Sequence, residues 1–199
     1  MVEPLVLALF IALHGSVQDK ESLRFQYCLE QGYDTSCGMT VAGTMLDRYW
    51  DIPVTELELI ETVLRDKLDS GDYTVSLADM STAFSAYGLS SKAYKLDWDG
   101  LIQVIGKGFA PLIVHYEFPE KHFALLLGFR DGRAITVDPA RGMESLSREQ
   151  FLARYSGVAM AAGGKQKAVN EKTIAAAMDY AGGKRDRMEE AASRIGRRW

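Results

Sequence analysis

The spacing of apolar residues changes near residue 90 and divides the chain into two parts. In the first part, apolar residues recur every three or four positions, which is the spacing of an amphipathic helix. This spacing predicts helices over residues 39–49, 55–68 and 76–87. The first of these helices follows an irregular entry over residues 20–36. The apolar stripes indicate that the three helices pack into one core.

Local signals mark where these helices begin and end. Thr55 followed three residues later by Glu58 has the pattern of a capping box, which predicts a helix start. The sequence Asp51-Ile52-Pro53 interrupts the first helix, and Gly88 is suited to end the third.

The second part contains short apolar runs that are typical of strands. Strands are predicted over 91–96, 110–116, 122–129, 133–137, 144–146 and 158–161, with short helices over 98–106 and 147–155. The pair Asp131-Gly132 predicts a hairpin turn between two of the strands. Helices followed by an antiparallel sheet indicate an α+β fold.

Beyond Gly163-Gly164 the chain becomes basic. Residues 165–199 hold nine Lys/Arg and five Asp/Glu, a net charge of +4, against −8 for residues 1–164. Helices are predicted over 168–180 and 186–195, joined at Gly182-Gly183. Such a segment can lie on its own acidic body or bind an acidic partner. We expect residues 164–199 to be a basic helical tail that is peripheral and used for docking.

Residues 4–13 form an apolar run that is too short to span a bilayer as a helix. The small residues Gly15 and Ser16 and a polar stretch follow it, which predicts a signal peptide over residues 1–17. Glu3 and the lack of a basic residue before the run leave an uncleaved amphipathic or core segment as the alternative. We expect export, with a single domain over residues 18–163.

The composition excludes several kinds of site. The chain has 199 residues, 47% of them hydrophobic and 25% charged, as in an ordinary globular protein. Two cysteines, no CxxC pair and three scattered histidines give no zinc pattern. The phosphate-binding patterns GxGxxG and the P-loop do not occur. We therefore expect no metal, no cofactor and no nucleic-acid partner.

The candidate chemistry begins at Cys37, which is followed by Gly38 and then by a predicted helix. A sulfur at the positive end of a helix is favoured as the thiolate, which is the nucleophilic form. The amide of Gln31, six residues upstream, could donate to an oxyanion that forms beside Cys37. The alternative for Cys37 is a small buried residue at the start of a core helix.

Two further residues make nucleophilic catalysis the better hypothesis. His122 begins an apolar strand, and Asp138 follows the next strand just before Pro139. The hairpin between them places both at the same end of neighbouring strands, where a carboxylate can orient an imidazole. Taken singly, His122 could be a structural histidine and Asp138 a turn residue. The order Gln, Cys, His, Asp at these offsets is much harder to reach by chance.

With these residues in place, the sequence resembles the bacteriocin-processing cysteine peptidases, the papain-like domain of double-glycine leader exporters. The resemblance rests on QGYDTSCG at 31–38, HF at 122–123 and DPARG at 138–142, and it covers roughly residues 25–162. One departure is Ser36, because the family often has an aspartate directly before the nucleophile. The resemblance implies a papain-like fold with the N-terminal helices packed on the C-terminal antiparallel sheet.

The resemblance also implies the roles of the four residues. Cys37 would be the nucleophile and His122 its base and later acid, with Asp138 orienting His122 and Gln31 in the oxyanion hole. The implied activity is a cysteine endopeptidase that processes an exported polypeptide, after a Gly-Gly-type motif, in a bacterial secretion or fibre-export pathway. Components of a secretion system would then be partners.

The sequence does not continue into the transmembrane and nucleotide-binding segments of the exporters, so we expect a free-standing, periplasmic or secreted member without a stable membrane span in the mature chain. The alternative from another class is a non-hydrolytic module that holds an export client in the same groove.

Overall fold

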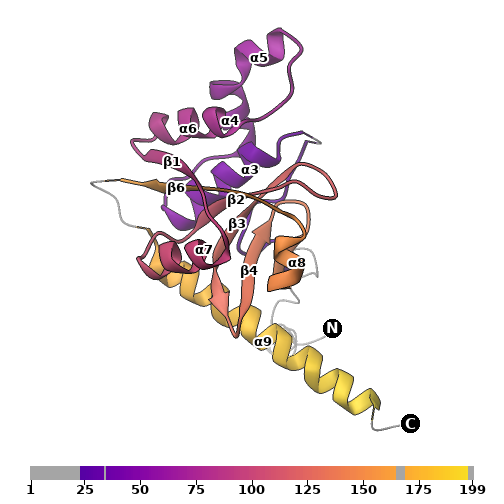
Figure 1. Ribbon diagram of the computed structural model, residues 1–199. Helices are drawn as coiled ribbons and strands as arrows, with labels where there is room; N and C mark the ends of the chain where they lie inside the picture. The colour runs from indigo at the N-terminus through magenta and orange to yellow at the C-terminus, as the bar shows by residue number, and fades with distance from the viewer. Residues whose placement is uncertain (1–22, 34, 165–168, 197–199) are drawn as a thin grey trace, which may run out of the picture.

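The protein is seen here as a computed structural model that describes residues 23–33, 35–164 and 169–196. Its centre is an antiparallel sheet with the strand order β1-β6-β2-β3-β4-β5 and helices on both faces (Figure 1). The strands are β1 (Ser90–Lys95), β2 (Leu112–Tyr116), β3 (His122–Arg130), β4 (Arg133–Asp138), β5 (Gly142–Ser147) and β6 (Tyr155–Gly163). The predicted α+β class is confirmed.

The helices are distributed along the whole described chain. They are α3 (Cys37–Thr44), which continues as the π-helix η1 (Met45–Tyr49), α4 (Glu56–Val63), α5 (Arg65–Asp69), α6 (Leu77–Ala86), α7 (Trp98–Gly106), α8 (Arg148–Leu152) and α9 (Glu171–Gly196). In Figure 1, α4, α5 and α6 lie at the top, while α9 runs diagonally along the bottom.

Alternating strand residues point to opposite faces of the sheet, so the sheet has two apolar faces. One face packs with α3, α6 and α9, and its buried strand residues include Ile113, Phe123, Leu125, Leu127, Ile135, Val137 and Met160. The other face packs with α7 and α8, and its buried strand residues include Leu112, Val114, Tyr116, Ala124, Leu126, Ala134 and Ala159. The sheet is therefore a central layer with a hydrophobic core on each side.

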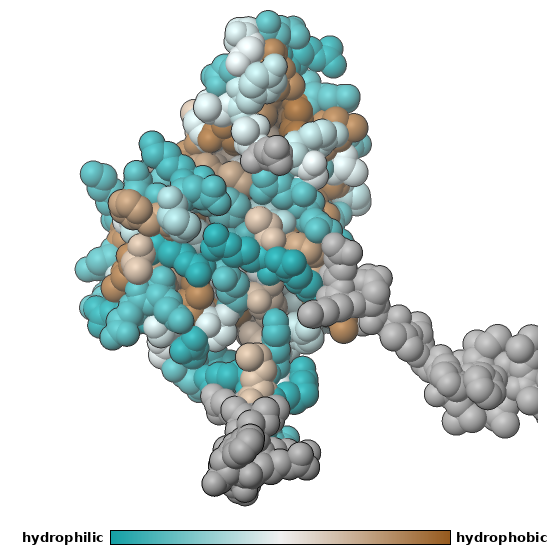
Figure 2. Space-filling view, turned by 90° about the vertical axis from the view of Figure 1, so that its right-hand side faces the viewer, coloured by the Kyte–Doolittle hydropathy of each residue, from teal (hydrophilic) through white to brown (hydrophobic). Residues whose placement is uncertain are grey.

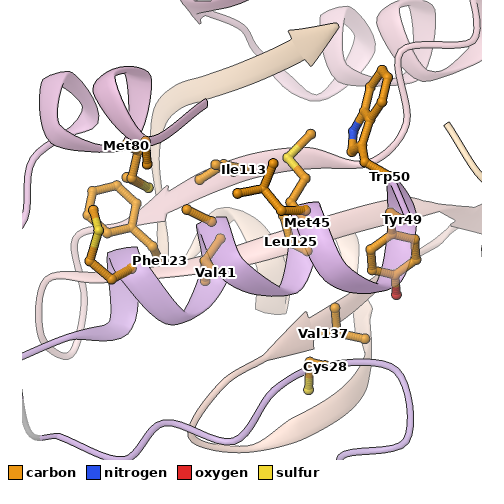
Figure 3. Close-up of a cluster of buried hydrophobic side chains, with 14 of the residues drawn as sticks. Cys28, Val41, Met45, Tyr49, Trp50, Met80, Ile113, Phe123, Leu125 and Val137 are labelled. Carbon is orange, nitrogen blue, oxygen red and sulfur yellow. The ribbon is translucent and has the colours of Figure 1, made fainter. Parts of the chain in front are cut away.

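Helix α3 begins with Cys37 and is deeply buried along the rest of its length. All of its residues except Cys37 are buried. Figure 3 shows Val41 and Met45 of this helical stretch beside Ile113 and Leu125 of the sheet. Burial of residues on every face of a helix means that the helix is enclosed on all sides. The core thus fixes the position of Cys37 through the rest of α3.

Several predicted boundaries are confirmed. The capping box of Thr55 with Glu58 is formed, and Ser147 forms another with Gln150. Asp131 and Gly132 have φ values of 52° and 72°, as a two-residue hairpin turn with the twist of the strands requires. Strands β3 and β4 pair directly on either side of that turn.

The predicted second helix is wrong in one respect, because residues 55–68 form two helices and not one. Leu64 ends α4 with a φ of −105°, and its side chain is buried in the core. The following helix α5 has no buried residue. The helical spacing of apolar residues continues past Leu64, but the residues after it are not buried in the core. Core packing therefore does not hold residues 55–68 as one helix.

The prediction of two tail helices is also wrong, because α9 runs through Gly182 and Gly183 without a break. A glycine inside a helix costs about 1 kcal/mol relative to alanine, which makes it look like a boundary. Here a Cβ on Gly182 would collide with the guanidinium of Arg130. That guanidinium donates to the carbonyl oxygen of Met178 at 3.0 Å and to the carboxylate of Asp179 at 3.2 Å. Gly182 is therefore a close-approach residue and not a helix end.

The first half of α9 belongs to the core, which corrects the expectation of a peripheral tail. Ala177 and Ala181 are buried in the same cluster as α3, and Ile174 and Met178 pack against it. The exposed Met188 belongs to the second half of the helix. The small side chains of Ala177 and Ala181 let the helix approach the sheet closely. The basic composition of residues 164–199 had instead suggested an exposed segment.

The predicted signal peptide at residues 1–17 lies outside the described residues, as does Ala168. Within the part of the chain that the structure describes, no helix combines the length and the apolar character that a bilayer crossing needs.

Candidate active site

Cys37 is the first residue of α3 and lines a cavity of about 690 Å³. The cavity lies between the loop that precedes α3, the start of β3 and the turn after β4. Its other lining residues are Glu30, Gln31, Gly32, Tyr33, Thr35, Thr74, Val75, His115, Glu120, Lys121, His122, Phe123, Pro139, Ala140 and Arg141. Three of the four predicted site residues therefore share one cavity.

The fourth residue, Asp138, lies behind His122. Nε2 of His122 is 2.9 Å from Oδ1 of Asp138, whose side chain is fully buried. The same Oδ1 accepts the backbone N–H groups of Ala140 at 2.8 Å and Arg141 at 3.2 Å. His122 opens β3 and Asp138 ends β4, so the hairpin brings them together at one end of the sheet. These backbone bonds hold the carboxylate in place while it orients the imidazole.

Electrostatics favour the charged form of His122. Burial lowers the pKa of its imidazole, but hydrogen bonds to Asp138 and Cys37, together with their negative charges, outweigh burial and raise it to about 9. Burial raises the pKa of Asp138, and the hydrogen bond and charge of His122 outweigh this and hold it below its usual range. Because Nε2 faces Asp138, Nδ1 is the ring nitrogen left for Cys37. The imidazole thus stands between the thiol and the carboxylate.

Gln31 is held at the cavity by both its backbone and its side chain. Its backbone N–H donates to the carbonyl oxygen of Pro139 at 2.9 Å. Its side-chain Nε2 donates to the carbonyl oxygen of Tyr33 at 2.6 Å. An amide nitrogen carries two hydrogens, so a second donor is there for a ligand. Gln31 and Cys37 thus line the same cavity.

His115 also lines this cavity, although it lies within the predicted strand over 110–116 and was not among the predicted site residues. His115 lies opposite Phe123 in the pairing of β2 with β3, and Phe123 is next to His122 in sequence. Its Nδ1 is 2.9 Å from the hydroxyl of Ser156, and burial lowers its pKa. The signal that could have revealed it is the register of the two strands, which the hydrophobic pattern alone does not fix.

The second cysteine, Cys28, lies outside the cavity. It is 2% exposed, and its Sγ donates to the backbone carbonyl oxygen of Asp138 at 3.7 Å. Burial raises the pKa of the Cys28 thiol to about 12, and the charge of Asp138 adds to this. Both cysteines are free thiols. Cys28 is therefore a core thiol that does not line the cavity.

Comparison with known proteins extends this picture. The model of the peptidase C39 family matches residues 26–167, which is most of the chain. The chain belongs to the peptidase C39 family. The predicted resemblance to the double-glycine leader peptidases is confirmed, and the prediction of a cysteine peptidase is confirmed at the level of the family.

Two relatives illustrate the similarity in sequence. The probable functional amyloid protease FapD of Pseudomonas fluorescens is 28% identical over 152 residues, which cover 73% of this chain and 64% of FapD. The colicin V secretion/processing ATP-binding protein CvaB of Escherichia coli is 31% identical over 97 residues, or 49% of this chain and 13% of CvaB. The chain thus spans less than two thirds of the length of these relatives.

Two solved structures show the same fold. A double glycine motif protease from an AMS/PCAT transporter, in complex with the leader peptide, has a TM-score of 0.55 at 24% identity and covers 71% of this chain and 90% of its own. The peptidase domain of Streptococcus ComA has a TM-score of 0.60 at 19% identity, with coverage of 70% and 99%. The predicted papain-like arrangement of the family is confirmed by this likeness.

Proposed function

We propose that the protein is a cysteine endopeptidase that cleaves an exported polypeptide. The observation that carries the proposal is the hydrogen-bonded row of Cys37, His122 and Asp138, in which Cys37 and His122 line one cavity and Asp138 lies behind them. A thiol, an imidazole and an orienting acceptor in this order are the parts that thiol catalysis requires. The membership in a peptidase family supports the same activity.

In the proposed reaction, the proton of the Cys37 thiol passes to His122, and the thiolate attacks the carbonyl carbon of the scissile peptide bond. The carbonyl π bond opens, and its electron pair goes to oxygen. Gln31 and the backbone N–H of Cys37 donate to that oxyanion. When the oxyanion collapses, the C–N bond breaks, and the imidazolium gives its proton to the leaving amine. Water, deprotonated by His122, then hydrolyses the thioester and restores Cys37.

An apolar groove next to the cavity supports a polypeptide substrate. It has a volume of about 240 Å³ and shares Tyr33, Thr35 and Val75 with the cavity. The rest of the groove is Ser36, Leu57, Ile60, Leu64, Leu68 and Tyr73. In Figure 2, brown apolar side chains lie among polar ones at the top of the molecule, where α4 and α5 are. We propose that apolar side chains upstream of the cleaved bond bind here.

The substrate that fits both surfaces has small residues at the bond and apolar residues before it. Glycines let a substrate backbone approach a narrow site closely, so a Gly-Gly-type motif is the cleavage signal that we propose. The similarity to a functional amyloid protease supports a client in a fibre-export pathway. The periplasm or the exterior, reached by a signal peptide at residues 1–17, is the compartment that we propose. The proposed peptidase domain covers residues 18–163, and the first half of α9 packs against its core.

The test is cleavage of a synthetic peptide that carries apolar residues before a Gly-Gly pair, with the products mapped by mass spectrometry. Wild type and Cys28→Ala should cut after the glycines, whereas Cys37→Ala should not. No cleavage by wild type, or equal cleavage by Cys37→Ala, would contradict the proposal. Binding of the intact peptide without turnover would instead favour the non-hydrolytic module.

A further inference from the structure

The carboxylate of Glu56 forms hydrogen bonds to the loop that carries Gln31 and leads to Cys37. Glu56 is the first residue of α4 and is only partly exposed. Its Oε2 accepts the backbone N–H of Gly32 at 2.9 Å. Its Oε1 accepts the hydroxyl of Thr40 at 2.7 Å and also contacts the hydroxyl of Ser36. One side chain thus bonds to three points on the segment from 32 to 40.

These three points lie on both sides of the nucleophile. Gly32 follows Gln31 directly, Ser36 precedes Cys37 directly, and Thr40 lies one turn into α3. Ser36 and Thr40 are buried, with exposed fractions of 4% and 0%. Ser36 is the N-cap residue of α3, yet its hydroxyl makes no cap bond to the helix. The hydroxyl is directed to Glu56 and to the carbonyl oxygen of Tyr33 instead.

The carbonyl group of Tyr33 connects this network to the amide of Gln31. It accepts Nε2 of Gln31 at 2.6 Å and the backbone N–H of Ser36 at 3.2 Å, and it lies 2.7 Å from the hydroxyl oxygen of Ser36. A path of hydrogen bonds therefore runs from Glu56 through Ser36 and Tyr33 to the amide that is proposed to bind the oxyanion.

The fit at Gly32 shows how closely the carboxylate approaches the loop. A Cβ on Gly32 would lie 3.0 Å from Oε2 of Glu56, which is tighter than ordinary van der Waals contact. The position at the N-terminus of α4 also suits a carboxylate, because the helix dipole is positive there.

We propose that Glu56 is a positioning residue that sets the Gln31 amide relative to Cys37 and so preorganises the oxyanion hole. The proposal rests on the peptidase function proposed above. A displacement of about 1 Å in such a site is enough to lower the rate by about a hundredfold. Without the carboxylate, the N–H of Gly32 and the two hydroxyls lose a shared acceptor, and the loop loses its attachment to α4.

The chemistry of the contacts predicts which substitution is tolerated. A glutamine at position 56 can accept the Gly32 N–H with its oxygen and donate to the hydroxyls of Ser36 and Thr40 with its nitrogen. Those hydroxyls can then donate to the carbonyl oxygens of Tyr33 and Ser36, which already lie within reach at 2.7 and 3.2 Å. Glu56→Gln should therefore preserve the network, and Glu56→Ala should break it.

The experiment measures kcat and KM on the Gly-Gly peptide for Glu56→Ala, Glu56→Gln and Glu58→Ala. Glu58 is the matched control, because it lies on the same helix and its carboxylate bonds to Thr55 and not, among the described residues, to the loop that carries Gln31. We expect Glu56→Ala to lower kcat ten- to a hundredfold with KM changed less than threefold. Glu56→Gln and Glu58→Ala should stay within threefold of wild type.

A double-mutant cycle separates positioning from a general loss of stability. In a Gln31→Ala background, Glu56→Ala should lower kcat by less than a further threefold, because the amide that it positions is gone. An unchanged kcat in folded Glu56→Ala would overturn the proposal, and so would an equal loss in both backgrounds. If Glu56→Ala does not fold, Gly32→Ala replaces it, since its methyl would press on Oε2. Gly32→Ala should lower kcat about tenfold, and an unchanged kcat overturns the proposal.

A second readout keeps this proposal distinct from the proposed function. A peptide aldehyde adds reversibly to a thiol and places an oxygen where the oxyanion forms. Failure of wild type to cleave the peptide contradicts the peptidase function alone. Binding of the aldehyde then tests the role of Glu56. A dissociation constant at least tenfold higher in Glu56→Ala than in wild type supports positioning. Equal dissociation constants in wild type and Glu56→Ala overturn it.

Discussion

Two cysteines nine residues apart in the sequence are linked to the same aspartate in different ways. Cys28 lies in the core, where its sulfur reaches the backbone carbonyl oxygen of Asp138. Cys37 lies at the cavity and is connected to the carboxylate of Asp138 through His122. The difference shows that what each sulfur faces, and not its place in the sequence, sets its chemistry. One thiol faces apolar side chains, and the other faces a cationic imidazole.

The two sulfurs lie in different surroundings. Burial disfavours a charged sulfur, which is why the pKa of Cys28 is raised to about 12. Cys37 lies at the cavity, and the raised pKa of His122 keeps a positive charge beside it at neutral pH. The comparison therefore predicts one reactive and one inert thiol in a single chain.

The largest expected effect is selective alkylation. At pH 7.5, a thiol of pKa about 12 is ionised only on the order of one part in 10⁴ to 10⁵. We expect iodoacetamide to label Cys37 at least a thousandfold faster than Cys28, as measured by peptide mass mapping over time. Equal rates in the folded protein would break the comparison. Labelling in denaturant is the control, because unfolding should make the two rates similar.

The next effect separates the two histidines of the cavity. His122→Ala should lower kcat/KM by about a thousandfold, because proton transfer by a positioned group is worth about 10²–10⁴. His115→Ala should lower it less than tenfold and should reduce stability instead, since His115 bonds to Ser156 and packs on Phe123. Kinetics with thermal unfolding of both variants provide the measurement. A thousandfold loss in folded His115→Ala would show that the wrong histidine was chosen.

Gln31→Ala should lower kcat about a hundredfold, which is typical for the loss of one donor to an oxyanion. The loss should appear in kcat at saturating substrate, because the donor acts in the transition state. Alkylation of Cys37 should hardly change, since alkylation forms no oxyanion. An unchanged kcat would remove Gln31 from the oxyanion hole.

Much of this site could be predicted because its residues carry local signals. A Cys-Gly before a helix, a histidine at a strand start and an Asp-Pro after a hairpin each mark a position on an element. The hairpin turn at Asp131-Gly132 then brings two of them together, whatever the rest of the fold does.

What could not be predicted depends on contacts between distant segments. Glu56 looks like an ordinary acidic residue in the first turn of a helix, and only the packing of α4 beside the loop reveals its three bonds. Gly182 looks like a helix break until Arg130 is found against it. In both cases tertiary packing overrides the local preference, and a single sequence does not contain that packing.

The aspartate shared by the two thiols gives the next test. The leaving amine needs a proton from the imidazolium, so activity should fall as pH rises through about 9, the pKa of His122. Asp138→Asn removes a negative charge that raises this pKa, and the alkaline limb should move down by about one pH unit. The kcat/KM profile from pH 6 to 10 measures it, with Glu144→Gln as a control carboxylate. An unmoved limb would separate Asp138 from His122.

The same linkage has a consequence for stability. Because the folded pKa of His122 lies above its ordinary value, the stability that it contributes is complete below about pH 6.5 and is lost as pH rises through about 9. Asp138→Asn should flatten this dependence. Cys28 should remain unlabelled in Asp138→Asn, because burial, the larger cause of its raised pKa, is untouched.

The smallest effect is expected from Cys28 itself. Figure 3 shows its side chain near Val137, under the helix that ends with Tyr49, and all three belong to one buried cluster. Cys28→Ala removes a buried sulfur and its contact with the carbonyl of Asp138, which should cost about 1–2 kcal/mol of unfolding free energy. For a chain of this size, Tm should fall by about 2–4 °C per kcal/mol. Because the backbone of Asp138 is also held by the pairing of β4 with β5, its carboxylate should stay in place, and kcat should remain within twofold of wild type. A tenfold loss of kcat in folded Cys28→Ala would show that the core thiol supports Asp138 through its backbone, so that the two regions act as one.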